Sequence, residues 1–193
     1  MKHAQPDLFA RTEPELPEGF KYRPDLLSAH EERALVESMA ALPLREFSFH
    51  GFLGKRRVVS YGWRYDFNGG GLQRTDDIPV FLLPLREKAA DFAGLAAAQF
   101  QQVLLTEYRQ GVTIGWHKDR SVFGDVVGIS LLSACSFRFR RRTSTRWERA
   151  ATLLEPRSIY LLRGPSRSAW EHSIPAVNAL RYSITFRSIR DDI

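Results

Sequence analysis

Three residues of this 193-residue chain have the chemistry and spacing to bind a metal ion. His117 and Asp119 are separated by one residue, so on a β-strand or at its edge their side chains point the same way. A His-x-Asp pair also arises often by chance, as a surface histidine beside a surface aspartate, so a third ligand is needed. His172 can supply it from a distant strand. Two histidines and one carboxylate on one face suit Fe(II) and leave coordination positions open.

The segment near the C-terminus adds a second chemical signal. Arg181 and Arg187 are six residues apart in an alternating segment, so both point to the same side of a strand. Tyr182, Ile184 and Phe186 point to the other side. Two inward-pointing guanidinium groups need anionic partners, because an unpaired buried charge is costly. A dicarboxylate such as 2-oxoglutarate offers one carboxylate to each, in the planar geometry that arginine binds well.

These motifs, in this order, resemble the AlkB family of Fe(II)/2-oxoglutarate dioxygenases over about residues 19 to 190. The resemblance rests on Tyr108-x-x-Gly111, His117-x-Asp119, His172 and the run from Arg181 to Arg187. It implies an α+β fold with a double-stranded β-helix (jelly-roll) core, supporting N-terminal helices and a lid of strands and loops. It also implies Fe(II), 2-oxoglutarate as co-substrate, and O2.

The resemblance assigns a role to each motif residue. The implied iron ligands are His117, Asp119 and His172. The implied 2-oxoglutarate contacts are Arg181 for the distal carboxylate, Tyr108 beside it, Arg187 near the carboxylate next to the keto group, and Thr106. The family usually has asparagine at the position of Thr106, which can donate only one hydrogen bond.

The implied reaction is oxidative demethylation of alkylated nucleic acid, with DNA slightly favoured over tRNA. Hydroxylation of an N-methyl group releases formaldehyde and the unmethylated base, while 2-oxoglutarate becomes succinate and CO2. DNA-repair relatives often carry a second acidic residue two positions after the iron-binding aspartate, where this chain has Ser121. The stretches around Asp119 and His172 look closer to relatives that act on tRNA. Hydroxylation of a protein side chain or a metabolite, and a non-catalytic jelly-roll binding module, remain alternatives.

Substrate-binding candidates lie in two basic regions. Trp63, Arg64 and Tyr65 fall where the lid strands are expected, and aromatic rings beside cations suit a flipped base. The alternative is one side of an ordinary half-buried strand. Arg138 and Arg140 alternate with Phe137 and Phe139, so the strand turns its arginines outward, and Arg140 and Arg142 are predicted to contact phosphates. A solvated hairpin is the competing interpretation. Ser121 completes the set of candidates.

The elements that position these residues follow from periodicity. Ser28 and Glu31 form a capping box that starts a helix ended by Pro43, and residues 79–97 predict a second helix. Residues 45–67 predict two strands with a tight turn, followed by a glycine-rich loop at 68–71. Further short strands are predicted at 102–108, 126–132, 136–142, 151–154, 158–162 and 182–187.

Composition limits the remaining questions. The chain has one cysteine and no apolar run of about 18 residues, so a Cys-based zinc site and a transmembrane helix are not expected. We expect a cytoplasmic monomer with no membrane partner. A net charge of +6 favours a polyanionic partner. Residues 1–17 are predicted to be a flexible arm before one domain at 18–193. In that arm, Gln5 to Phe9 resembles peptides that bind the bacterial sliding clamp, although it could simply tack the arm onto the domain.

Overall fold

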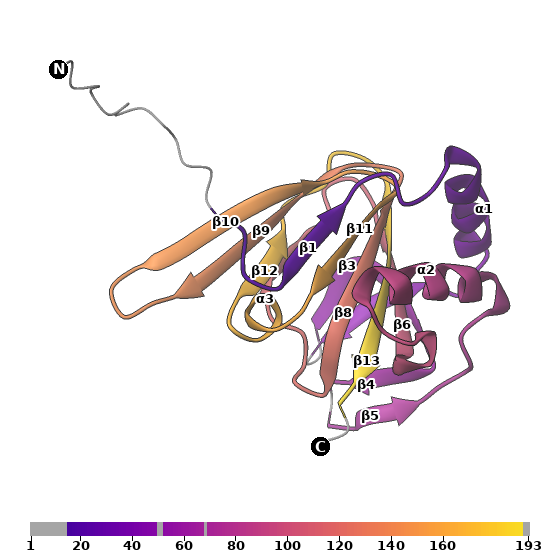
Figure 1. Ribbon diagram of the computed structural model, residues 1–193. Coiled ribbons are helices and arrows are strands. Elements are labelled where there is room, and N and C mark those ends of the chain that lie inside the picture. The colour runs from indigo at the N-terminus through magenta and orange to yellow at the C-terminus, as the bar shows by residue number, and fades with distance from the viewer. Residues whose placement is uncertain (1–14, 50–51, 68, 191–193) are drawn as a thin grey trace, which may run out of the picture.

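Two antiparallel sheets packed against each other form the core of the computed structural model, which describes residues 15–49, 52–67 and 69–190 (Figure 1). The strand order of the large sheet is β1 (Phe20–Arg23), β11 (Ser158–Leu162), β8 (Phe123–Leu131), β13 (Arg181–Ile189), β6 (Phe100–Tyr108), β3 (Phe52–Tyr61) and β2 (Arg45–Phe49). That of the smaller sheet is β10 (Trp147–Leu154), β9 (Cys135–Arg142), β12 (Glu171–Ile174) and β7 (Ile114–His117). This arrangement confirms the predicted jelly roll.

Each face of the large sheet contributes to a separate apolar cluster. One face carries alternate residues of the central strand β13, among them Ile184 and Phe186, and packs against the helices. The opposite face packs against the smaller sheet, with Phe137 and Phe139 of β9 fully enclosed. The period-2 pattern of these strands therefore decides which side chains are left to point into the space between the sheets.

The helices cover the large sheet on one side (Figure 1). They are α1 (Ala29–Ala40) and α2 (Leu83–Ala93), with the short turns η1 (Val80–Leu82) and η2 (Ala97–Gln99), while α3 (Pro165–Ser168) lies beside the smaller sheet. The capping box at α1 is confirmed: the Glu31 amide donates to Ser28 Oγ, and the Ser28 amide donates to Glu31 Oε2. The second helix is shorter than predicted, because Gly94 ends it in the left-handed conformation with φ of +66°.

Residues 45–67 form three strands instead of the predicted two. The third strand is β4 (Trp63–Asp66), which pairs with β5 (Gly71–Arg74) in a separate two-stranded sheet. Gly62, with φ of +76°, separates β3 from β4. A Cβ atom there would lie 2.1 Å from the Gln101 carbonyl oxygen, so a larger residue would not fit. The predicted turn at residues 50–51, and residue 68 of the predicted loop, lie outside the described residues.

The N-terminal arm is largely beyond what the structure describes. Residues 1–14, including the segment from Gln5 to Phe9, are not among the described residues. Within the described part of the chain, no helix is long and apolar enough to cross a membrane.

A buried carboxylate ties α1 to the large sheet. Glu32 is 7% exposed, and one of its oxygens accepts a hydrogen bond from the Leu132 amide at 2.8 Å. The other oxygen pairs with Arg157 Nη1 at 3.2 Å. Leu132 and Arg157 both have positive φ, at +70° and +63°, and such a conformation is strained in residues other than glycine. Glu32 therefore links two strained turns to the helix.

Replacing Glu32 should measurably destabilise the protein. In Glu32→Ala the Leu132 amide and the Arg157 guanidinium lose their shared acceptor, so we expect the free energy of unfolding in urea to fall by about 1–3 kcal/mol. Glu37→Ala, on the exposed side of the same helix, is the control and should stay within about 0.5 kcal/mol of the wild type. Equal effects of the two substitutions would contradict this role for Glu32.

Candidate metal and co-substrate site

Strand pairing brings the two candidate histidines together. His117 is the last residue of β7, and His172 lies directly opposite it on β12. Their ring centroids are 4.3 Å apart. Neither β7 nor β12 was predicted as a strand, since each has only four residues and no clear alternation. The proximity of two residues so far apart in the sequence is therefore a product of the sheet.

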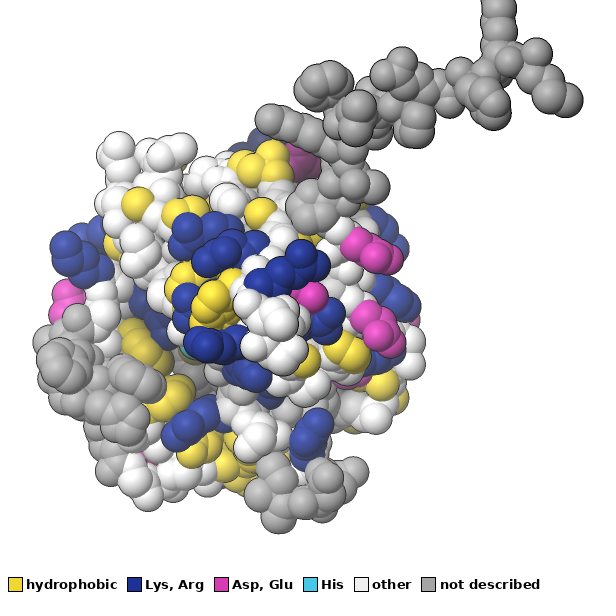
Figure 2. All heavy atoms as spheres, turned by 90° about the vertical axis from the view of Figure 1, so that its left-hand side faces the viewer, with side chains coloured by type: hydrophobic (Ala, Val, Ile, Leu, Met, Phe, Trp, Pro, Cys, Tyr) yellow, Lys and Arg dark blue, Asp and Glu magenta, His cyan; other side chains and the backbone are white. Residues whose placement is uncertain are grey.

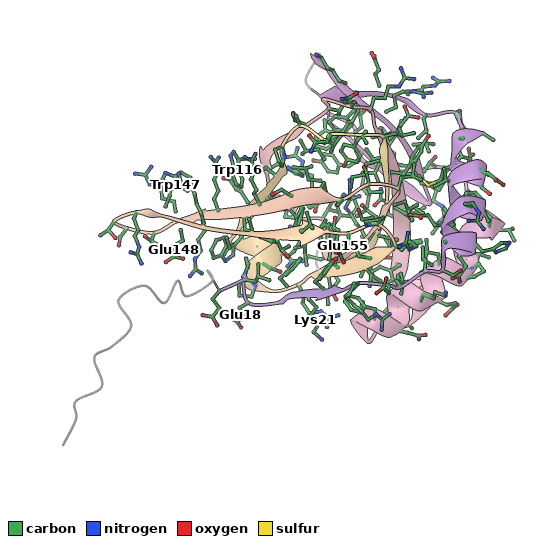
Figure 3. All side chains as sticks on the ribbon, turned by 90° about the horizontal axis from the view of Figure 1, so that it is seen from above. Glu18, Lys21, Trp116, Trp147, Glu148 and Glu155 are labelled. Atoms are coloured by element: carbon green, nitrogen blue, oxygen red, sulfur yellow. The ribbon has the colours of Figure 1, made fainter. Side chains whose placement is uncertain are left out.

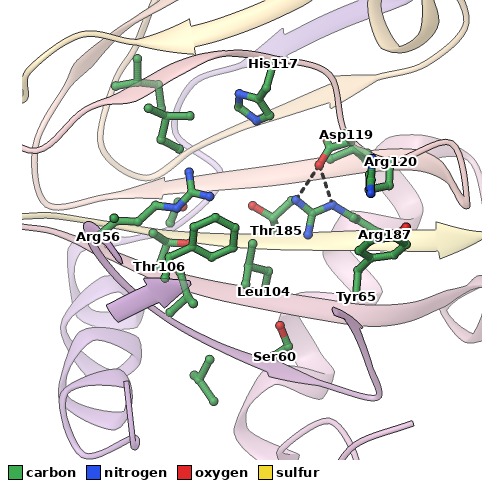
Figure 4. Close-up of a pocket in the computed structure, with 18 of the residues that line it drawn as sticks. Arg56, Ser60, Tyr65, Leu104, Thr106, His117, Asp119, Arg120, Thr185 and Arg187 are labelled. Carbon is green, nitrogen blue, oxygen red and sulfur yellow. Dashed lines mark hydrogen bonds and ion pairs between the residues drawn. The ribbon is translucent and has the colours of Figure 1, made fainter. Parts of the chain in front are cut away.

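Asp119 joins this pair from the loop that follows β7. Its Oδ1 accepts hydrogen bonds from Arg187 Nη2 at 2.8 Å and Nε at 3.1 Å, as Figure 4 shows. Its Oδ2 lies 4.0 Å from His172 Nε2. Arg167 of α3 holds the loop itself, donating to the backbone carbonyls of Asp119, Arg120 and Phe123.

The three side chains supply the donor set for a metal without forming a ready-made cage. Among the described residues, no group of three His, Cys, Asp or Glu side chains already stands in an arrangement that could hold a metal ion. One of the three side chains, Asp119, already has its Oδ1 paired with Arg187. His117 Nδ1 lies 2.9 Å from the Gly115 carbonyl, so this nitrogen carries the proton and Nε2 keeps its lone pair. Two imidazoles and a carboxylate oxygen that face one another fit Fe(II).

The electrostatics of the cluster keep these groups in metal-binding protonation states. Burial, and after it the neighbouring His117, lower the pKa of His172 to about 3. Burial also lowers the pKa of the half-buried His117. Burial on its own would raise the pKa of Asp119, but Arg187 and then His172 outweigh it and hold that pKa well below its usual range. Both imidazoles are therefore neutral and the carboxylate is charged at neutral pH, as metal coordination requires.

Arg181 is a buried cation with an unused donor. It is 1% exposed, its Nε donates to Ser130 Oγ at 3.1 Å, and its guanidinium lies 4.9 Å from the centre of the Tyr108 ring. Its Nη1 has no hydrogen-bond partner among the described residues. A buried guanidinium with a free donor is stabilised when an anion binds it, so Arg181 fits a carboxylate of the co-substrate.

A single large cavity connects these groups. It has a volume of about 1090 Å³ and is lined by both histidines, Asp119, Arg181 and Arg187. Thr106 and Tyr108, the other predicted 2-oxoglutarate contacts, also line it. The sequence predicted that Arg181 and Arg187 point to the same side of their strand, and the structure agrees, because both line this cavity. Tyr182, Ile184 and Phe186 pack in the core on the opposite face.

The rim of the cavity combines aromatic rings and cations. Tyr65 and Phe67 have ring centroids 5.0 Å apart. The Arg120 guanidinium lies 4.6 Å from the centre of the Tyr65 ring and 5.4 Å from that of Phe67. Arg56 of β3 points into the cavity from the other side, and its guanidinium lies 4.0 Å from the centre of the Phe47 ring (Figure 4). Arg56 is half-buried there, and this burial lowers the pKa of its guanidinium.

The predicted substrate-binding residues divide into two groups. Arg64 and Tyr65 line the cavity. Four others do not line it: Trp63, Ser121, Arg140 and Arg142. For Trp63 and Ser121 this differs from the expected place beside the target base, whereas Arg140 and Arg142 were expected to face outward, and their contact with phosphates stays a prediction. Unlike Tyr65, Trp63 does not line the cavity, and its ring packs against Arg74 of β5, whose guanidinium lies 5.6 Å from the ring centre. Arg140 and Arg142 lie on the outer face of the smaller sheet.

Two cationic residues of this site, Arg120 and Arg167, were given no role from the sequence. A third, Arg56, was recognised only as part of the basic stretch 55–57 beside the aromatic residues of the expected lid. Arg120 directly follows Asp119, so its position beside a metal ligand was the one available signal. Arg56 and Arg167 reach the site only through the pairing of β3 with β6 and the docking of α3.

The fold and this cluster define a jelly-roll oxygenase of the type that binds a metal and a small dicarboxylate. Residues 20–187 match the 2OG-Fe(II) oxygenase superfamily. The chain belongs to this superfamily of oxygenases, which use Fe(II), 2-oxoglutarate and O2, and its similarity to AlkB homologues supports its placement in the AlkB family. The cofactors implied by the sequence are thus confirmed.

Similar proteins carry several different functional names. The chain is 31% identical over 181 residues to the Arabidopsis thaliana "Alkylated DNA repair protein ALKBH8 homolog", covering 81% of this chain and 51% of that protein. It is 31% identical over 152 residues to the Bos taurus "DNA oxidative demethylase ALKBH2", covering 69% and 53%. It is 26% identical over 166 residues to the Xenopus tropicalis "tRNA (carboxymethyluridine(34)-5-O)-methyltransferase alkbh8", covering 83% and 26%. The chain therefore spans between a quarter and about half of the length of these relatives.

A solved structure supports the architecture. The chain titled "The structure of OsALKBH1" superposes with a TM-score of 0.69, covering 90% of this chain and 100% of that chain. At 15% sequence identity, this likeness concerns the fold alone.

The depressed pKa of His172 predicts acid sensitivity in the metal-free protein. The folded state holds His172 neutral down to about pH 3, whereas the unfolded chain protonates it near pH 6.5. The stabilisation is therefore complete above pH 6.5 and is lost as the pH falls toward 3. For His172 alone, we expect the free energy of unfolding to drop by about 2 kcal/mol between pH 7 and pH 5. Urea titrations with a chelator present would measure it.

Two variants isolate the contribution of His172. His172→Asn should flatten this pH dependence, and His30→Asn, at an exposed position on α1, should leave it as in the wild type. An unchanged slope in His172→Asn would contradict the assignment of the effect to this histidine.

Proposed function

We propose that this enzyme removes alkyl groups oxidatively from the bases of nucleic acid, with DNA favoured over tRNA. The observation that carries the proposal is the continuity of one cavity from the buried His and Asp cluster to a rim of aromatic rings and arginines. A flipped base needs stacking surfaces at the rim and an oxidising centre at the end of the pocket. The comparison with a DNA oxidative demethylase supports DNA, and the relatives named for tRNA keep tRNA as the second candidate.

His117 Nε2, His172 Nε2 and Asp119 Oδ2 would hold the iron. Bound there, Fe(II) supplies the oxidising chemistry with O2 and 2-oxoglutarate, which is converted to succinate and CO2 as one oxygen atom enters the substrate. Arg187 keeps Asp119 ionised and holds its Oδ1, which leaves Oδ2, the oxygen nearer His172, for the metal.

The remaining cavity residues would position the co-substrate. Arg181 offers its free Nη1 to the distal carboxylate, beside the Tyr108 hydroxyl and Thr106. Arg187 lies closer to the metal ligands and is placed for the carboxylate next to the keto group. Gln102 accepts a hydrogen bond from Arg187 Nη1 at 3.0 Å, which fixes that guanidinium in place.

Loss of Arg181 should weaken 2-oxoglutarate binding selectively. Arg181→Ala removes a charge-assisted contact worth about 1.5–3 kcal/mol, so the KM for 2-oxoglutarate should rise by about 10- to 150-fold. Fe(II) affinity, measured separately by titration, should change little because Arg181 contacts no proposed iron ligand. A comparable loss of iron binding would instead assign Arg181 a structural role.

A substrate panel tests the nucleic-acid assignment. Succinate production should be stimulated by methylated single-stranded DNA, whose unpaired bases can reach the aromatic rim. Stimulation by methylated tRNA should be weaker, as expected from the similarity to a DNA oxidative demethylase. Asp119→Ala should abolish the stimulated turnover through loss of a metal ligand. Turnover stimulated only by proteins or metabolites would refute the proposal and favour the alternative hydroxylase.

A further inference from the structure

The outer face of the smaller sheet carries a row of cations and aromatic rings. In β9 the odd-numbered Phe137 and Phe139 are buried, so Arg138, Arg140 and Arg142 point outward. Across the hairpin, Trp147 is paired with Arg142 and Arg149 with Arg140, which places them on the same face. The hairpin of β9 and β10 projects from the body of the molecule (Figure 1).

Contacts between guanidinium groups and indole rings order this face. Arg138 and Arg140 lie 5.0 Å and 4.6 Å from the centre of the Trp116 ring. Arg140 and Arg142 lie 4.7 Å and 5.9 Å from the centre of the Trp147 ring. Arginine and tryptophan side chains thus contact one another in alternation. We call this set of side chains the arginine–tryptophan row: Arg138, Trp116, Arg140, Trp147 and Arg142. Trp116 and Trp147 project from one side of the hairpin and Glu148 from the other (Figure 3).

The positive charge of this face is largely uncompensated. Glu171 pairs with Arg140 at 2.6 Å, and Arg138 donates to Ser173 Oγ. Arg142 and Arg149 have no ion pair among the described residues. Glu148 points away and pairs with Arg141. Figure 2, which looks toward the projecting hairpin, shows Lys and Arg side chains interspersed with hydrophobic ones.

The row begins at the cavity. Trp116 lines it, and the neighbouring His117 on the same strand points inward to the metal cluster. The remaining members of the row lie on the β9–β10 hairpin. Contact with the indole rings restricts the arginine side chains before any ligand arrives, which lowers the entropic cost of binding. The face is therefore pre-arranged for a linear polyanion that also reaches the cavity.

We propose that the arginine–tryptophan row binds the phosphates of the unpaired DNA strand whose adjacent base enters the cavity. This inference rests on the proposed function and adds the path of the substrate. Arginines two residues apart on a strand point to the same side, and their Cα atoms are about 6.8 Å apart. That spacing matches adjacent phosphates joined by the C2′-endo sugars typical of DNA better than the shorter spacing of an A-form RNA strand. A single row also serves one backbone, not the two of a duplex.

Fluorescence anisotropy with labelled oligo(dT) tests the proposal. In Arg138→Glu/Arg142→Glu the affinity should fall at least tenfold, and the slope of log K against log salt should flatten by about 1.4, for two lost phosphate contacts. Lys21→Glu/Arg33→Glu is the matched control, because it changes the net charge equally at exposed positions on β1 and α1. The control should stay within about twofold of the wild type. Thermal melting of each variant checks that it is folded.

The outcomes separate this inference from the proposed function. Wild-type protein that binds neither oligo(dT) nor oligo(U) would overturn both. If the affinity for oligo(dT) falls equally in the two double variants, the row has no specific role in binding, and the proposed function still stands. A row-dependent loss seen with oligo(U) but not with oligo(dT) would overturn the assignment to DNA.

Discussion

The buried ion pair between Arg187 and Asp119 is the interaction on which the site depends. Both side chains are about one-tenth exposed, and each is stable there because the other neutralises it. The pair ties the central strand β13 to the loop after β7, and so joins the two sheets at the point where His172 lies. Gln102 holds the same guanidinium and Arg167 holds the backbone of the loop. Removal of either partner would leave a buried charge without compensation, in a site that needs Asp119 charged.

The apolar core determines where the inner arginines point. Tyr182, Ile184 and Phe186 are buried against the helices, which leaves Arg181 and Arg187 no orientation except toward the cavity. Hydrophobic packing on one side of β13 therefore supplies the free energy that keeps two cations inside on the other side. The unused donor of Arg181 follows from this arrangement, because folding buries the group before its anionic ligand is bound.

Arginine performs three distinct tasks in this protein, and its surroundings decide which. Arg187 is buried and paired with a carboxylate, so it sets the charge of the metal cluster. Arg120 lies against aromatic rings at the rim, where a base can approach. Arg140 and Arg142 are ordered by Trp147 on an outer face, where they offer positive charge to a polyanion. The net charge of +6 describes none of these roles by itself.

The sequence alone determined the features that depend on local periodicity and short-range chemistry. The capping box of Ser28 and Glu31, the common direction of Arg181 and Arg187, and the convergence of His117 with Asp119 all follow from residue spacing. Only the tertiary structure decided that His172 lies beside His117, that Trp63 lies outside the cavity lining, and that Trp116 contacts arginines of another strand. The physical reason is that strand register and sheet order are set by packing between distant segments. Strands as short as β7 and β12 carry too few residues to encode such pairing locally.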